Sequence, residues 1–109
     1  MKRKSREKKT LRLFPNETLD DLLFGQLLII QPRKGYRYSV DALLISDFVL
    51  PEIKKNHKTL DIGCGAGTIS LILAKRSKAR EITGVEIQKA LAEMAKRNVR
   101  LNHLEDRTK

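Results

Sequence analysis

The chain has 109 residues, of which 40% are hydrophobic and 33% charged, and its formal net charge is +10. This length allows one small domain, and the longest apolar run, residues 27–30, is too short to cross a bilayer. A single cysteine, Cys64, excludes an intrachain disulfide, which fits a reducing compartment. Together with the short apolar runs, this predicts a cytoplasmic protein without membrane association.

The start of the chain is strongly basic. Residues 1–12, MKRKSREKKTLR, contain seven Lys or Arg against one Glu. Such a run predicts contact with a polyanion, most simply RNA, because phosphate neutralisation needs only mobile positive charge. A disordered, solubilising tail is an equal alternative, since charge runs are often merely solvated. We assign residues 1–14 to a basic disordered tail.

Residues 15–58 predict an N-terminal extension built as helix, hairpin and helix. Thr18 is a suitable N-cap for a short helix over residues 19–24. Residues 27–31 and 36–39 have strand-like patterns on either side of a turn, which predicts a hairpin.

An apolar helix over residues 40–49 ends this extension. Ser39 is well placed to cap its start, and Pro51 marks its end. A basic linker over residues 54–58 then leads into the following unit.

Residues 59–109 predict a nucleotide-binding core. Their first part, TLDIGCGAGTISLILAKRSKAREITGVE, indicates strand, glycine loop, helix and strand, the opening of a parallel βαβ unit. The basic residues at 75–80 indicate a solvated helix end, and an amphipathic helix that ends near residue 102 follows the second strand.

The glycine loop indicates a nucleoside pocket. Gly63, Gly65 and Gly67 stand at alternate positions, where missing Cβ atoms let a ligand lie directly on the backbone. Glu86 follows Gly67 by 19 positions and is expected at the tip of the second strand. A carboxylate there accepts hydrogen bonds from both hydroxyls of a ribose.

The loop departs from the dinucleotide fingerprint G-x-G-x-x-G. Whether the first two glycines of the fingerprint are aligned with Gly63 and Gly65 or with Gly65 and Gly67, this sequence has no glycine at the third position. A nicotinamide or flavin enzyme is therefore a disfavoured alternative. The loop, D-x-G-x-G-x-G with Asp61 at its head, resembles the first motif of class I S-adenosylmethionine-dependent methyltransferases. Asp61 suits a cationic ligand better than a pyrophosphate.

A more specific resemblance covers residues 17–107. The phrases GYRYSVDALL and GVEIQ, the latter followed by an AKRNV helix, resemble the N-terminal half of bacterial tRNA adenine N6-methyltransferases that modify the anticodon loop of a valine tRNA. The resemblance implies an α/β fold of the Rossmann-like class I type, S-adenosyl-L-methionine as cofactor and tRNA as partner. The residues that it assigns to cofactor binding are Asp61, Gly63, Gly65, Gly67, Glu86, Tyr38, Ser39 and Asp41.

The same resemblance also implies a catalytic motif that this sequence lacks. The catalytic Asn-Pro-Pro-Tyr motif of the family is absent. We therefore expect a core truncated after its second strand and helix, inactive alone and complemented by a C-terminal chain. A non-catalytic basic RNA-binding module or a gene remnant with the same scaffold remains the alternative. His57 and His103 are isolated in the sequence, so no metal site is expected.

Overall fold

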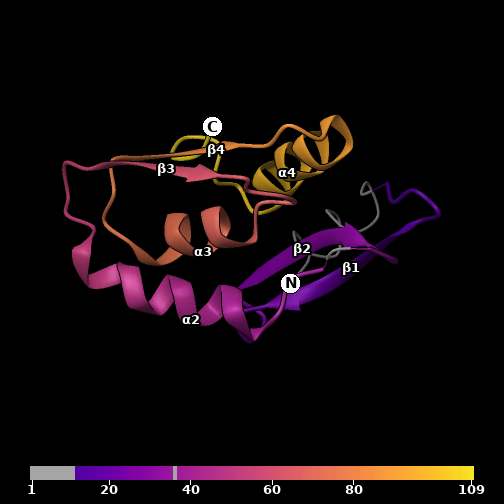
Figure 1. The fold of residues 1–109 in the computed structure, drawn as a ribbon, viewed down its shortest axis with the longest axis horizontal. Coiled ribbons are helices and arrows are strands. Elements are labelled where there is room, and N and C mark those ends of the chain that lie inside the picture. The colour runs from indigo at the N-terminus through magenta and orange to yellow at the C-terminus, as the bar shows by residue number, and fades with distance from the viewer. Residues whose placement is uncertain (1–11, 36) are drawn as a thin grey trace.

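The computed structural model describes residues 12–35 and 37–109, so most of the predicted basic tail lies outside the described residues. The elements are β1 (Glu17–Leu22), β2 (Leu27–Pro32), α2 (Val40–Val49), the 3-10 turn η1 (Leu50–Glu52), β3 (Lys58–Ile62), α3 (Thr68–Arg76), β4 (Glu81–Val85) and α4 (Lys89–Leu101). An N-terminal hairpin packs against helices α3 and α4, which lie on a parallel strand pair, and helix α2 packs beside α3 (Figure 1).

The predicted βαβ unit is confirmed. β3 and β4 pair in parallel, and α3 covers one face, where Ile82 is fully buried against Leu73 and Ala74. Thr108 forms a parallel bridge with Ile82, which places the end of the chain beside β4 on the side away from β3. Within the described residues β4 is the single strand neighbour of β3.

The opposite face of this strand pair is apolar and exposed. Leu60 and Ile62 of β3 are 57% and 79% exposed, and Val85 of β4, directly opposite Ile62, is 49% exposed. Side chains alternate across a strand, so these three share the face that α3 does not cover.

The predicted helix over residues 19–24 is wrong, because this segment belongs to β1, which pairs antiparallel with β2. Asp20, which would lie in the first turn of such a helix, instead accepts hydrogen bonds from Thr18, Gln31 and Arg37. The hairpin therefore joins β1 to β2. The predicted returning strand is also wrong over residues 37–39, which are irregular, and Tyr36 lies outside the described residues.

Helix α2 agrees with the sequence prediction in both bounds and cap. The Ser39 hydroxyl accepts a hydrogen bond from the Asp41 N–H, at 3.3 Å. Only Ala42 and Ser46 are buried in this helix.

Two asparagines, Asn98 of α4 and Asn102 at its C-cap, attach this helix to the outer edge of β2. The Asn98 amide pairs with both backbone groups of Ile30, at 2.6 and 2.8 Å, and the Asn102 amide pairs in the same way with Leu28, at 2.9 and 2.7 Å. Four residues of helix rise about 6 Å and two residues of strand about 6.6 Å, so the spacings match. A helix thus takes the place of a third strand beside the hairpin.

Candidate functional site

The glycine loop turns the chain from β3 into α3 through three positive φ angles. Gly63, Gly65 and Gly67 have φ of 72°, 59° and 95°, a region that L-residues with a Cβ rarely adopt. A Cβ built on Gly63 or Gly65 would meet no atom within 4 Å, so the space beside both residues is open. The loop is anchored to the neighbouring strand, because the N–H groups of Gly63 and Cys64 donate to the Val85 carbonyl at 2.7 and 3.0 Å.

Glu86 directly follows β4, as predicted, and its carboxylate lies against the loop. The Gly65 N–H donates to Oε1 and the Gln88 N–H to Oε2, each at 2.9 Å. These two backbone hydrogen bonds, that of Gln88 first, hold the pKa of Glu86 below its ordinary value. Each oxygen of the ionised carboxylate has a further lone pair, so the group can accept two more hydrogen bonds.

Asp61 and Tyr38 approach the loop from the other side. The Ser70 hydroxyl of α3 donates to Asp61 at 2.7 Å, and the Tyr38 hydroxyl donates to the Asp21 carbonyl at 3.0 Å. Tyr38, Asp61 and Gly63 line one small hollow of about 70 Å³. The structure therefore places an acid and an aromatic ring at the start of the glycine loop.

The remaining two predicted residues, Ser39 and Asp41, lie apart from this hollow. Ser39 and Asp41 are exposed at the start of α2, and neither lines the hollow that contains Tyr38. The structure gives them a role in capping α2, and it gives no contact between either side chain and the glycine loop.

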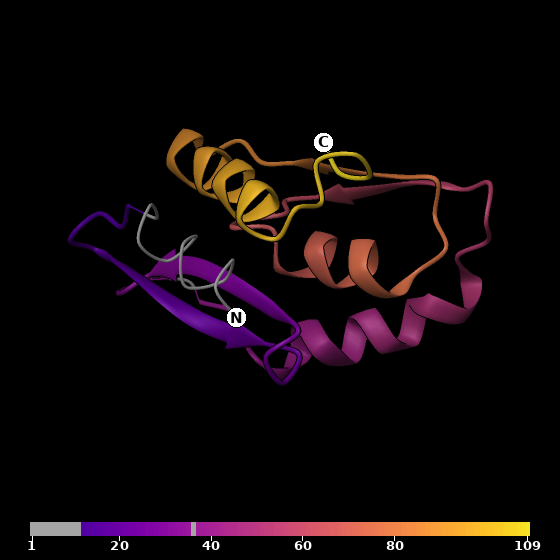
Figure 2. The same cartoon turned by 180° about the vertical axis from the view of Figure 1, so that it is seen from behind.

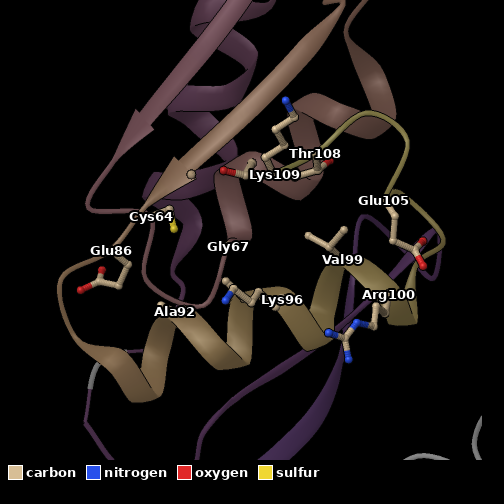
Figure 3. Close-up of a pocket in the computed structure, with 13 residues that line it drawn as sticks. Cys64, Gly67, Glu86, Ala92, Lys96, Val99, Arg100, Glu105, Thr108 and Lys109 are labelled. Atoms are coloured by element: carbon tan, nitrogen blue, oxygen red, sulfur yellow. The ribbon is translucent and has the colours of Figure 1, made fainter.

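A larger cavity of about 410 Å³ lies between α4, the loop, β4 and the end of the chain (Figure 3). Its walls include Ala92, Ala95 and Val99 of α4. Of the predicted residues only Gly67 and Glu86 line it, and the Glu86 carboxylate points away from Val99 (Figure 3). We therefore regard it as a space between helix and sheet, behind the loop, and not as the surface that the predicted residues share.

Two residues that support the loop were not singled out from the sequence. The Asn98 amide, fully buried, also donates to the Ala66 carbonyl inside the loop at 2.8 Å. Gly84 of β4 leaves room for Cys64, since a Cβ at position 84 would lie 2.9 Å from the Cys64 sulfur. Polar residues at the spacing of Asn98 and Asn102 could have drawn attention, because both fall on the otherwise apolar side of α4.

Burial, followed by the nearby charges of Asp61 and Glu86, raises the pKa of Cys64 to about 11. The thiol is thus neutral near pH 7, and Cys64 acts as a small packing residue in the loop. Among residues 12–35 and 37–109, no cluster of three or more His, Cys, Asp or Glu could hold a metal ion. No helix in the described part of the chain is long and apolar enough to span a bilayer.

Comparisons with known sequences all find methyltransferases. The model of the methyltransferase small domain family matches residues 39–109. The tRNA1(Val) (adenine(37)-N6)-methyltransferase of Yersinia pestis strain Pestoides F is 35% identical over 80 residues, which are 72% of this chain and 32% of that protein. The homologue from Yersinia pseudotuberculosis strain YPIII is also 35% identical over 80 residues, at 31% of its length. The chain therefore spans about a third of the curated relatives that it matches.

Solved structures agree in fold. TYW2 of M. jannaschii in complex with AdoMet has a TM-score of 0.72 at 20% identity, over 91% of this chain and 44% of that one. Trm5 of Methanocaldococcus jannaschii in complex with adenosine has a TM-score of 0.71 at 18% identity, over 91% of this chain and 30% of that one. At these identities the likeness concerns the fold, which is Rossmann-like α/β.

Proposed function

The chain belongs to the methyltransferase small domain family, and on that premise we propose that it binds S-adenosyl-L-methionine on the open side of the glycine loop. Glu86 accepts the ribose hydroxyls, the backbone of Gly63 and Gly65 supports the ligand, and Asp61 with Tyr38 faces its methionine end. Ser39 and Asp41 act on this site through the start of α2.

The observation that carries the proposal is the Glu86 carboxylate at the tip of β4. Its two oxygens accept backbone N–H groups of Gly65 and Gln88, which fixes the orientation of the carboxylate, and each oxygen of an ionised carboxylate can accept more than one hydrogen bond. Open space beside Gly63 and Gly65 leaves room for a ligand against the backbone. Both features fit an adenosine with a free 2′- and 3′-hydroxyl pair.

Bound S-adenosyl-L-methionine supplies an electrophilic methyl group, and the family relatives suggest an adenine of tRNA as its acceptor. We propose that residues 1–109 hold the cofactor and do not transfer the methyl group alone. This sequence has no Asn-Pro-Pro-Tyr, the motif that the resemblance assigns to the target base. In-line transfer requires that base to be held in a defined orientation. The predicted complementing chain would supply this part, and the RNA-binding alternative predicts no cofactor binding at all.

The test is isothermal titration of the full chain with S-adenosylhomocysteine. In Glu86→Gln the amide oxygen can accept only one of the two backbone N–H groups, of Gly65 and Gln88, and the charge is lost, so we expect affinity to fall roughly 10- to 100-fold, the range for hydrogen bonds to a charged group. Glu93→Gln is the matched control, because Glu93 is an exposed carboxylate of α4 paired with Lys96. A folded wild-type chain that binds no S-adenosylhomocysteine, or equal losses in both variants, would refute the proposal.

A further inference from the structure

We infer that the end of the molecule opposite the glycine loop is a surface that binds the phosphate backbone of RNA. This surface, the basic edge, is made of two loops that precede β3 and β4. It rests on the proposed function in that it assigns part of the RNA contact to residues far from the cofactor. Its exposed cations are Lys54, Lys55, Lys58, Lys75, Arg76, Lys78 and Arg80.

The fold brings these two loops together. They lie side by side at the same end of the molecule in both views (Figures 1 and 2), and the Arg80 N–H donates to the His57 carbonyl at 2.9 Å. In the sequence the first loop looks like a linker and the second like a solvated helix end. Because β3 and β4 pair in parallel, the loops that precede them lie at the same end, and the seven charges form one surface.

Arg107 holds the second loop in place. Its guanidinium donates to the carbonyls of Ala74, Ser77 and Ala79, at 2.6, 3.0 and 2.6 Å. A shallow hollow of about 660 Å³ opens above it, and the residues that line it are Lys55, Asn56, Ser77, Lys78, Ala79, Arg80 and Arg107. Lys78 and Arg80 therefore project into this hollow from a loop with a fixed backbone.

The positive charge of the basic edge is only partly balanced by nearby acidic residues, since Glu81, opposite Lys58 in the strand pair, also makes an ion pair with Lys109 at 3.2 Å. Neither loop, at residues 54–58 and 75–80, contains Asp or Glu. In the described part of the chain, only Arg76 among the seven makes an ion pair, with Asp47 at 3.4 Å, and both side chains are well exposed. The dipole at the end of α3 accounts for Lys75 and Arg76 in its last turn, but not for the five cations outside that helix.

A polynucleotide fits this surface better than a compact anion. Seven exposed cations at one end of the molecule, three of which line the open hollow, match repeated phosphates along a chain, which need no single enclosed site. β3 has five residues and is therefore about 17 Å long, so one RNA stem-loop can contact the basic edge and still present a base near the loop at the far end of the strands.

The experiment measures binding of the full chain to a short RNA stem-loop by fluorescence anisotropy between about 50 and about 200 mM salt. The variant Lys55→Gln/Lys78→Gln/Arg80→Gln removes three charges from the basic edge. The control Lys34→Gln/Lys96→Gln/Arg100→Gln removes three exposed charges elsewhere. We expect roughly 10- to 100-fold weaker binding for the edge variant, with a log–log salt slope shallower by about 2, and a clearly smaller change for the control.

Several results would overturn the inference. These are no binding of RNA by the wild-type chain, equal losses in the two triple variants, and an edge variant that loses affinity for phosphatidylserine vesicles but not for RNA. Titration of the same proteins with S-adenosylhomocysteine separates this surface from the cofactor site. A wild-type chain that binds RNA in the expected pattern without binding S-adenosylhomocysteine would support the basic edge and refute the proposed function.

Discussion

Replacing Asn98 by alanine should destabilise the chain more than the same change at Asn102. Both amides pair with the N–H and the carbonyl of one β2 residue, but Asn98 is fully buried and donates additionally to Ala66 of the glycine loop. Asn98→Ala leaves three backbone groups without partners, the buried N–H and carbonyl of Ile30 and the partly buried carbonyl of Ala66. At about 1 kcal/mol or more for each, the expected loss is about 3–5 kcal/mol of unfolding free energy.

Asn102→Ala is the matched control, four residues along the same helix. Its site at Leu28 is partly exposed, so water can replace the lost hydrogen bonds, and we expect a loss of about 1–2 kcal/mol. Urea denaturation followed by circular dichroism measures both variants. Under conditions where both are folded, S-adenosylhomocysteine affinity should fall only in Asn98→Ala, since only this change frees the loop. Equal destabilisation by the two changes, or unchanged ligand affinity in Asn98→Ala, would show that the contact with Ala66 does not support the loop.

Three further outcomes follow from the contacts of single residues. Gly84→Ala places a Cβ 2.9 Å from the sulfur of Cys64 and should cost about 1–3 kcal/mol in urea denaturation, partly restored by Cys64→Ala; an unchanged midpoint would contradict the close approach. Because its pKa is about 11 instead of 9.0, the Cys64 thiol should react with iodoacetamide at pH 8 about 100-fold more slowly in the folded than in the urea-unfolded chain, and similar rates would be inconsistent with its burial. Burial raises the pKa of Glu17, but hydrogen bonds from Arg97 at 2.7 Å and from the Phe14 N–H, with the charge of Arg97, bring it below 4.5. This stabilisation is therefore present above about pH 4.5 and is lost as pH falls through the folded-state pKa, and Glu17→Gln should flatten that part of the stability profile measured by urea titration at a series of pH values.

The parts of the fold that could be predicted from the sequence depend on local chemistry. Ser39 caps α2 through its own neighbour, and three glycines permit the loop conformation whatever packs around them. The tip position of Glu86 follows from the length of the βαβ unit.

The N-terminal part could not be predicted, because partners distant in the sequence determine it. Thr18 with two following aspartates has the local pattern of a helix start, yet Asp20 is held by Gln31 and Arg37 in a strand pair. Tertiary contacts override propensity in such a short segment. The support of the glycine loop by Asn98 was missed for the same reason, since the hydrogen bonds join residues that are 68 and 32 positions apart.

The attachment of α4 to β2 also determines when the hairpin can reach its final place during synthesis. Asn98 emerges 68 residues after Ile30, so at a translation rate of about 5–20 residues per second the outer edge of β2 remains without its partner for roughly 3 to 14 s. A hairpin forms in microseconds, far sooner than that. During this interval the edge is open to pairing with other strands, including those of a neighbouring nascent chain.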